Sequence, residues 1–197
     1  MSSDKVLYVN PETKDVVATG NIIANGNVGI GTTNPTQKLH VNGFMISYPL
    51  MTIIEEQQPS GTNGGSAVAA TWNIRQLNTR VVNNLNLAAP VSGVFTLPIG
   101  TYYIDASAIA HAVQHHKIRL FNTTANTTSM FGTSEFALAS GGAGYGSSSI
   151  KGVLVVPTIT NYRLDHYTAI SYATYGLGGA TSQGTEIYAR IIITQIA

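Results

Sequence analysis

SGVFTLPIGTYYIDASA, residues 92–108, contains two runs rich in Val, Thr, Tyr and Ile on either side of a turn at Pro98–Gly100. Short runs of this kind, bounded by Gly and Pro, are typical of β-strands joined by tight turns. The spacing of apolar residues that marks an amphipathic helix is missing here, and it is not sustained anywhere else in the chain. The sequence therefore predicts an all-β protein.

The same pattern extends along the chain on both sides of this stretch. We expect eight strands, at residues 69–77, 94–97, 102–110, 117–122, 129–133, 149–156, 162–167 and 186–195. This number of short strands fits a jelly roll of two packed sheets. Trp72, Phe95, Tyr103 and Ile118 lie on these runs and are expected to be mostly buried. The last run is apolar on both faces beyond Tyr188, which is typical of a central strand or of a subunit interface.

The first 48 residues differ in kind. Their apolar runs are much shorter and are separated by turn clusters such as Asn10–Thr13, Asn25–Asn27 and Thr32–Pro35. A segment this short, with so little apolar surface, does not build a core of its own. Several chains wound together would bury the same side chains. We therefore expect an oligomeric shaft segment at residues 1–52 and a jelly-roll head domain at residues 53–197.

Composition excludes several classes of protein. The chain has 10 Lys and Arg against 9 Asp and Glu, so its net charge of +1 argues against a nucleic-acid partner, which requires a basic surface. The absence of cysteine excludes a disulfide scaffold, a thiolate zinc site and a cysteine nucleophile. The polar N-terminal residues do not resemble a signal peptide, and the longest apolar runs are far shorter than a membrane span. We expect no membrane insertion.

Two groups of residues resemble known families. NGNVGIGTTNPTQKLHVNG (25–43) resembles a motif in the trimeric shafts of tail fibres and tailspikes from bacteriophages and related viruses, where three chains wind into a β-helical stalk. Residues 92–108, together with HKIRLFNTT, SSIKGVLVV, YRLDHY and EIYARIIITQ, resemble a C1q/TNF-like jelly roll. The collagen-like Gly-X-Y stalk that often precedes C1q-type domains is missing here. A shaft motif followed by a terminal jelly roll resembles the receptor-binding end of a viral fibre.

The resemblance implies a homotrimeric phage tail-fibre tip that attaches to a host-surface receptor, with a glycan as the expected ligand and no catalysis. It implies a place on the virion, production in the host cytoplasm, function outside the cell, and continuity with the rest of the fibre at the N-terminal end. Two alternatives stay open. One is a structural head that only trimerises the fibre and nucleates its folding; the other is a polysaccharide depolymerase.

The candidate ligand-binding residues come from topology and composition. Because consecutive strands of a jelly roll run roughly antiparallel, the connections at 78–93, 111–116, 134–148 and 168–185 are expected at one end, away from the shaft. These connections contain His111, Tyr145 and Tyr175. Tyrosine among Gly, Ser and Asn is typical of adaptable recognition loops. We therefore expect Tyr145, Tyr175 and His111 to contact the ligand.

Other chemistry has weaker support. Strand alternation would place His111 and His115 on one face and His116 on the other, and copies of one histidine around a three-fold axis would suit Zn, Ni or Cu. No neighbouring carboxylate orients these rings, so we expect no metal.

Asp105 is expected to be a structural carboxylate. Glu55 and Glu56, adjacent in an extended segment, point opposite ways and cannot form an acid/base couple. The glycine-rich stretches 29–31 and 142–146 do not open a helix, so the sequence predicts no phosphate site, no cofactor and no catalytic residues.

Overall fold

The structure is a computed structural model that describes residues 8–9, 16–17, 24–42, 50–139 and 144–197. The chain divides into two compact units, Met1–Tyr48 and Pro49–Ala197, and the second is called the head below. All regular structure in the described ranges is β-strand, which confirms the prediction of an all-β protein. Within those ranges no helix is long and apolar enough to cross a membrane.

The N-terminal unit contains two small strand pairs. β1 (Tyr8–Val9) pairs antiparallel with β2 (Val16–Val17), and β3 (Val28–Ile30) pairs in parallel with β4 (Leu39–Val41). Between residues 24 and 42 no side chain is buried, and Ile30 and Leu39 are more than half exposed. The described part of this unit therefore has no apolar core within one chain.

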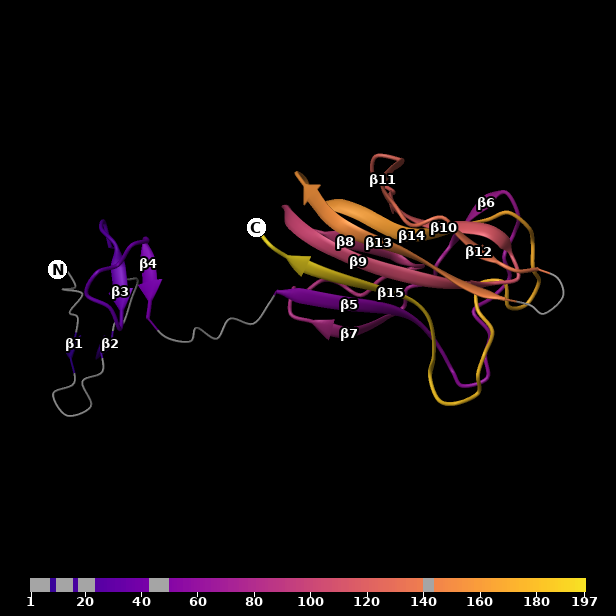
Figure 1. Cartoon of the computed structure of the whole chain (residues 1–197), viewed down its shortest axis with the longest axis horizontal. Helices are drawn as coiled ribbons and strands as arrows, with labels where there is room; N and C mark the ends of the chain where they lie inside the picture. The colour runs from indigo at the N-terminus through magenta and orange to yellow at the C-terminus, as the bar shows by residue number, and fades with distance from the viewer. Residues whose placement is uncertain (1–7, 10–15, 18–23, 43–49, 140–143) are drawn as a thin grey trace. The chain divides into compact units, whose positions relative to one another are not determined.

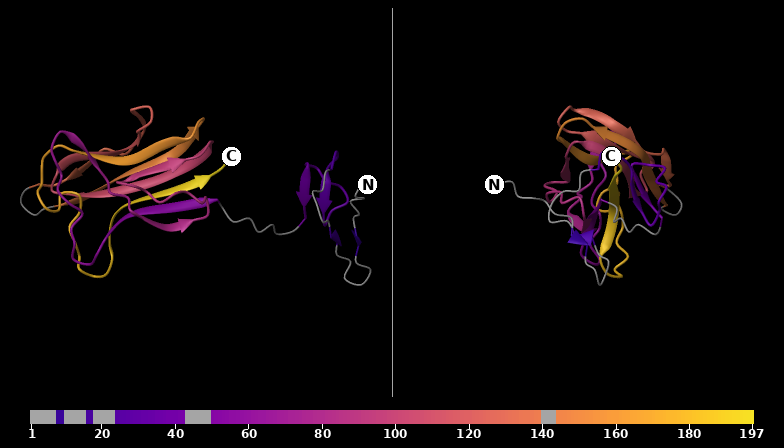
Figure 2. Two further views of the ribbon diagram at one scale, coloured as in Figure 1. Left: turned by 180° about the vertical axis from the view of Figure 1, so that it is seen from behind. Right: turned by 90° about the vertical axis from the view of Figure 1, so that its left-hand side faces the viewer.

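The head is a jelly roll of two sheets. One has the order β13-β9-β15-β5-β7; the other has the order β11-β10-β14-β6, with β12 beside β10 and β8 beside β14. The bounds are β5 (Met51–Gln58), β6 (Thr71–Ile74), β7 (Thr79–Asn83), β8 (Val94–Leu97), β9 (Gly100–His111), β10 (Gln114–Asn122), β11 (Thr127–Phe131), β12 (Glu135–Ala137), β13 (Tyr145–Val156), β14 (Thr160–Thr168) and β15 (Glu186–Gln195). Figure 2 shows that the axes of the long strands in both sheets are roughly aligned.

Each of the eight predicted strands overlaps a strand of the structure, but β5, β7 and β12 lie outside the prediction. The sequence of β5, MTIIEEQQ, contains two successive glutamates and shows no clean alternation, so its pattern did not mark a strand. β7 lies in the expected loop 78–93. It pairs with β5 and carries the chain to Asn84, whose amide bonds the carbonyl of Met51. The prediction that this connection joins the other three at one end is therefore wrong.

The core lies between the two sheets. Phe95 and Ile118 are buried there, as predicted, together with Tyr102, Ile104 and Leu120. Trp72 is only half-buried, on the outer face of its sheet.

The prediction that Tyr103 is buried is wrong, because β9 alternates in the other phase. Tyr102 points into the core, where its hydroxyl donates a hydrogen bond to the carbonyl of Pro98 at 3.0 Å. Tyr103 points outward and is 39% exposed. Asp105 lies on the same outer face and forms an ion pair with Lys151 at 3.4 Å.

β15 is a central strand, flanked by β9 and β5. Its inward residues Ile191 and Ile193 are fully buried, whereas Ile192 on the outer face is half-buried. Of the two explanations for its apolar sequence, a central position is confirmed. The outer face of this sheet retains apolar side chains.

Each of the two adjacent glutamates of β5 forms an ion pair with an arginine. Glu55 accepts from Nε of Arg190 at 2.6 Å on the outer face, while Glu56 accepts from Nε of Arg75 at 2.7 Å in the interior. The two carboxylates thus point opposite ways, as expected from an extended strand. Arg75 is fully buried and also donates to the carbonyl of Leu177 at 2.9 Å.

The head has two distinct ends (Figure 1). We call the end of the head at which β5 begins and β15 ends the near end, and the start of β9 lies beside them. The strand termini at His111, Tyr145 and Glu186 lie at the opposite, far end. The connections 112–113 and 169–185 therefore lie at the far end, together with β12 of the connection between β11 and β13, which pairs with the start of β10. This is the arrangement predicted for three of the four loops.

Candidate functional site

The far end of the head brings two of the predicted residues into direct contact. His111 is the last residue of β9 and Tyr145 is the first of β13, so both lie at strand ends rather than in loops. They are direct cross-strand partners, and their ring centroids are 4.6 Å apart. The side chains of residues paired in this way lie next to each other on one face of the sheet. The pairing register of β9 and β13 therefore fixes the position of one ring over the other.

Two further tyrosines from the connection between β14 and β15 complete the group. The Tyr175 ring lies 4.9 Å from the His111 ring, and the Tyr172 ring lies 5.2 Å from it. Tyr172 donates its hydroxyl hydrogen to the hydroxyl of Tyr175 at 2.9 Å. We call His111, Tyr145, Tyr172 and Tyr175 the aromatic cluster. All three residues predicted from the sequence belong to it, and Tyr172 was missed.

The other histidines of the segment HAVQHHK lie elsewhere. Ala112 and Gln114 have positive φ angles of 53° and 59°, and this turn carries the chain from one sheet to the other. The expectation that His111 and His115 share a strand face is therefore wrong. His115 is exposed and packs edge-on against Phe136 at 5.0 Å, whereas His116 is buried. Within the described residues, no three His, Asp or Glu side chains are grouped as they would be around a metal ion.

His111 is a buried member of the aromatic cluster. It is 4% exposed, and its Nδ1 has no hydrogen-bond partner in the described structure. Burial lowers the pKa of the imidazole below its ordinary value, so the ring is uncharged at neutral pH. The hydrogen bond to Tyr175 raises the pKa of Tyr172. The cluster is therefore a neutral surface of aromatic rings and hydroxyl groups.

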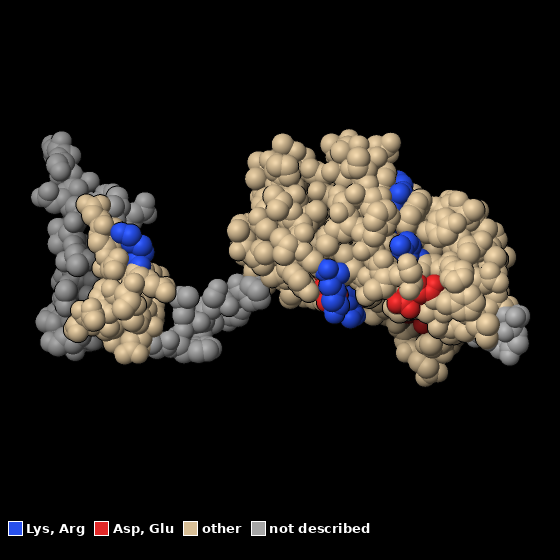
Figure 3. All heavy atoms as spheres, turned by 45° about the horizontal axis from the view of Figure 1, so that its top comes forward, with Lys and Arg blue, Asp and Glu red and all other residues tan. Residues whose placement is uncertain are grey.

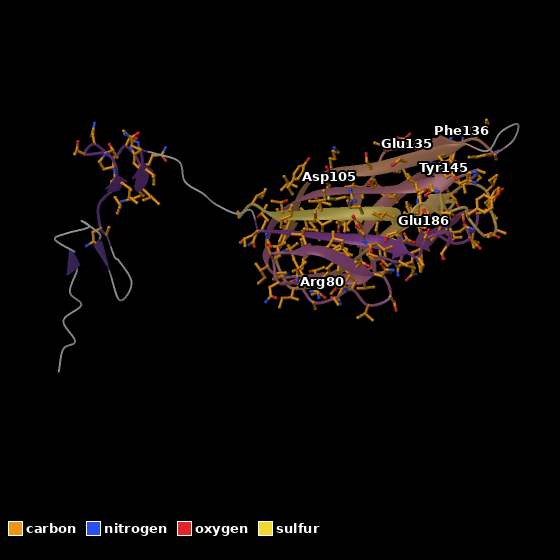
Figure 4. The ribbon with its side chains drawn as sticks, turned by 90° about the horizontal axis from the view of Figure 1, so that it is seen from below. Arg80, Asp105, Glu135, Phe136, Tyr145 and Glu186 are labelled. Atoms are coloured by element: carbon orange, nitrogen blue, oxygen red, sulfur yellow. The ribbon has the colours of Figure 1, made fainter. Side chains whose placement is uncertain are left out.

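The exposed rim of the far end is aromatic and apolar. Tyr145 is 58% exposed, and Phe136 and Leu138 are each nearly half exposed. Figure 4 shows Phe136 and Tyr145 at the same end of the head, whereas Asp105 lies toward the other. Rings that are held by neighbours and exposed on one side present contact area without losing much conformational entropy on binding. This arrangement suits non-covalent recognition.

Glu186 anchors the connection that supplies Tyr172 and Tyr175. Its buried carboxylate accepts hydrogen bonds from the backbone amides of Ser182 at 2.7 Å, Thr181 at 3.0 Å and Gly61 at 3.2 Å. These bonds, with that of Thr181 the most important, lower the pKa of Glu186. The carboxylate thus ties residues 61 and 181–182 to the start of β15. Sequence reasoning missed this role because its partners are backbone amides, which leave no signature in the sequence.

The glycines of this connection permit close approach. A Cβ atom at Gly179 would lie 2.5 Å from the hydroxyl oxygen of Tyr145, and one at Gly178 would collide with the ring of Tyr188. The Tyr188 hydroxyl donates to the carbonyl of Thr62 at 2.7 Å. The glycine-rich sequence at 176–179 thus allows the backbone to pack onto two tyrosines.

Asp105 and His111 do not form a catalytic couple. They lie on the same face of β9 but are six residues apart, which corresponds to about 20 Å along a strand. Asp105 is paired with Lys151 instead. The aromatic cluster itself holds no carboxylate and no serine.

No family model matches the chain, and no curated protein matches its sequence. Solved structures with a similar fold include the globular domain of zebrafish complement 1qA (TM-score 0.47, 14% identity, 76% of this chain and 98% of that one). Murine APRIL at pH 5.0 has a TM-score of 0.44 and 11% identity over 74% of this chain and 99% of that one. Eiger TNF from S. frugiperda has a TM-score of 0.49 and 8% identity over 76% and 94%.

All three likenesses have TM-scores below 0.5 and identities of 8–14%, so the head is not assigned by them. Its assignment as an all-β jelly roll rests on its own strand order and antiparallel pairing.

Proposed function

We propose that this chain is the receptor-binding tip of a phage tail fibre, which assembles as a homotrimer and attaches to a host-surface glycan without catalysis. The observation that carries the proposal is the aromatic cluster, in which three tyrosines surround His111 at the far end of the head. The shaft-like motif at residues 25–43 supports a place on a virion, with the rest of a fibre joined through the N-terminal unit.

The chemistry of the cluster favours a saccharide. The C–H groups of a sugar ring carry partial positive charge and pack against the negative face of an aromatic ring. Tyrosine hydroxyls supply the hydrogen bonds that orient sugar hydroxyls. Since none of the four residues of the cluster carries a charge, each copy would bind weakly. Three copies on one trimer would gain affinity through multivalency.

Two features support self-association. The described part of the N-terminal unit exposes Ile30 and Leu39, which a single chain does not bury. The outer face of the five-stranded sheet exposes Tyr103, Val153 and Val155. Its charges are already paired, Asp105 with Lys151 and Glu55 with Arg190. Exposed apolar patches of this kind mark protein–protein contacts. His111 and Tyr145 lie at the far end of the same face, so a trimer would gather three aromatic clusters at one end.

The test is a glycan array probed with the full-length chain, alongside its Tyr145→Ala and Tyr175→Ala variants. We expect selective binding by the wild-type protein and loss of that binding in both variants, with unchanged oligomeric mass. Ile99→Ala is the matched control, since Ile99 is an exposed apolar residue in the near-end turn between β8 and β9. Binding that survives both tyrosine changes, or that Ile99→Ala also abolishes, would refute the site.

A structural head is the second candidate, and the apolar outer face of the five-stranded sheet favours it. It predicts a stable trimer that binds no saccharide on the array. Release of reducing ends from a polysaccharide that the chain binds would instead indicate a depolymerase.

A further inference from the structure

A second group of aromatic rings lies on the opposite side of the head, on the outer face of the six-stranded sheet. The Trp72 ring is 5.6 Å from that of Tyr167 and 6.3 Å from that of Phe131. Phe131 is 62% exposed, and Trp72 and Tyr167 are half-buried. These rings come from β6, β11 and β14. They form a continuous aromatic surface across three strands.

Cationic side chains lie over aromatic rings of this face, including that of Phe121. The guanidinium of Arg119 is 4.1 Å from the Trp72 ring centroid and 4.2 Å from that of Phe121. The ammonium of Lys117 is 5.4 Å from the Phe131 ring, and the guanidinium of Arg163 is 5.0 Å from that of Phe121. Contacts of this kind hold long cationic side chains in place. The surface is thus both aromatic and basic.

The acidic residue that pairs with these cations is buried. Asp165, the sole acidic residue of strands β6, β10, β11 and β14, is fully buried. It accepts from Arg163 at 2.7 Å and from Arg119 at 2.9 and 3.0 Å. Two guanidinium groups therefore bind one carboxylate that solvent does not reach, and Lys117 is a third cation of this face. The arginines are therefore already oriented, and the face carries a net positive charge. Figure 3 shows that charged side chains are few on the side of the head that it draws.

We propose that Trp72, Lys117, Arg119, Phe131, Arg163 and Tyr167 form a second binding site, the aromatic–basic platform, which binds a carboxylate-bearing acidic polysaccharide. Sugar rings stack on the half-exposed indole and phenyl faces. Their carboxylates pair with Lys117 and Arg163, while Arg119, which is 14% exposed and bonded to Asp165 and Thr128, holds the Trp72 ring in place. Because Asp165 and the rings already orient the arginines, binding orders few side chains and costs little entropy.

The charge of this face points to a polyanion, and its aromatic content points to one with apolar ring faces. The whole chain carries a net charge of +1, which is too little for the phosphate density of nucleic acid. A carboxylated polysaccharide has a lower charge density and presents pyranose C–H faces to the rings. The platform also remains accessible in the proposed trimer, because the self-associating face belongs to the other sheet.

The experiment measures binding of the full-length chain to four polymers by biolayer interferometry. Polygalacturonate is the carboxylated probe, dextran the neutral one, dextran sulfate the sulfated one, and a single-stranded DNA oligonucleotide the nucleic-acid one. We expect binding to polygalacturonate that weakens as salt is added. Binding to dextran as strong as to polygalacturonate, tighter binding to DNA or dextran sulfate, or no binding to polygalacturonate would overturn the proposal.

Variants locate the site. Lys117→Gln and Phe131→Ala are each expected to weaken polygalacturonate binding about tenfold, which corresponds to about 1.4 kcal/mol. Lys38→Gln, an exposed lysine of the N-terminal unit, is the control and is expected to bind as the wild type does. Tyr145→Ala also leaves this binding intact, so the platform and the aromatic cluster fail or succeed separately. Both platform residues are exposed or half-buried, and melting temperatures check that the variants are folded. Unchanged affinity in folded Lys117→Gln and Phe131→Ala would refute the site.

Discussion

Nδ1 of His116 lies 2.9 Å from Nε2 of His166, and both imidazoles are buried between the two sheets. The opposite ring nitrogens, Nε2 of His116 and Nδ1 of His166, have no hydrogen-bond partner in the described structure. Arg75 and the Glu56 carboxylate paired with it approach from the side of β5, and Glu135 of β12 approaches His116. A buried pair of this kind makes the stability of the head depend on pH.

Acid is expected to destabilise the head through this pair. Burial, Arg75 and His116 hold the pKa of His166 well below its ordinary value of 6.5, and burial lowers that of His116. The folded chain therefore binds fewer protons than the unfolded chain, so stability is fully present above about pH 6.5 and falls as the pH drops below it. We expect the melting temperature to fall between about pH 7.5 and pH 5.5, and His166→Gln to reduce that fall by about 2–4 °C or more.

The comparison between variants is necessary because Glu56 acts in the opposite direction. Burial raises its pKa above 4.5, so its protonation in the folded state favours folding as the pH falls. His115→Gln is the matched control, since His115 is exposed and directly precedes His116 in β10. If His115→Gln reduces the pH dependence as much as His166→Gln does, the buried pair is not its source.

The packing around the two histidines requires a glycine at position 146. A Cβ at Gly146 of β13 would collide with Nε2 of His116. A Cβ at Gly152 of the same strand would meet only the flexible end of Met130, at 2.9 Å. Gly146→Ala is therefore expected to cost about 1–3 kcal/mol of unfolding free energy through overpacking. Gly152→Ala should cost less than 1 kcal/mol, on the order of a tolerated core change. Chemical denaturation of both variants measures the difference, and equal costs would contradict the close packing of His116.

Phe95 and Tyr145 allow the packing of the core to be distinguished from ligand recognition. Phe95 is buried, and its ring lies 6.2 Å from that of Tyr162. Phe95→Ala is expected to cost about 3–5 kcal/mol, which lowers the melting temperature by roughly 10 °C in a chain of this size. Tyr145→Ala removes a side chain that is mostly exposed and should have a much smaller effect. Thermal unfolding followed by circular dichroism compares the two. Similar shifts would mean that Tyr145 is a core residue.

The sequence predicted the fold well where alternation is regular. Residues 92–108 alternate through β8 and most of β9, but the adjacent Tyr102 and Tyr103 left the phase of β9 ambiguous, and the core selected Tyr102. β5 was missed because its two glutamates look like solvent-exposed residues. Both are in fact neutralised by arginines far along the chain, Arg75 and Arg190. A local pattern does not reveal partners at such distances.

The candidate site was predicted in part for the same reason. Alternating chain direction indicated that the ends of β9, β13 and β14 meet, and this places His111, Tyr145 and Tyr175 together. Tyr172 precedes Tyr175 by three residues, a spacing that would have suggested a pair, but the turn that joins their hydroxyls has no sequence signature. The cation–aromatic stacking of Arg119 on Trp72 joins residues 47 positions apart on different strands, so only the structure reveals the aromatic–basic platform.

Glu186 supports the aromatic cluster without touching it. Its carboxylate holds the amides of Gly61, Thr181 and Ser182. In Glu186→Gln the side chain loses its charge and one acceptor oxygen, so these N–H groups are held by weaker, uncharged hydrogen bonds, and the N–H of Thr181 no longer has both oxygens to bond. We expect faster hydrogen exchange at Thr181 and Ser182 and weaker glycan binding, with the oligomeric mass unchanged.

Glu135→Gln is the control for this change, since Glu135 lies at the same end of the head in β12 (Figure 4). It should leave exchange at Thr181 and Ser182 as it is in the wild type. Protection that persists at these amides in Glu186→Gln would show that the connection is held by its other contacts.

The outer face of the five-stranded sheet offers the sharpest test of assembly. Val155 is 65% exposed on β13, and its neighbour Val153 is paired directly with Tyr103. An ammonium group placed in an apolar interface must be desolvated without a partner, which is costly. We therefore expect Val155→Lys to dissociate the assembly. Light scattering should give about three times 20.8 kDa for the wild type and a mass that falls toward 20.8 kDa for the variant.

Ile159→Lys provides the control for this change. Ile159 is 68% exposed only four residues further along, but it lies in the turn between β13 and β14 rather than on the sheet face. Its substitution by lysine leaves a charge in water and should keep the mass of the wild type. A wild-type mass near 20.8 kDa would refute the proposed trimer. A trimer that Ile159→Lys dissociates and Val155→Lys does not would place the interface at the near-end turns instead.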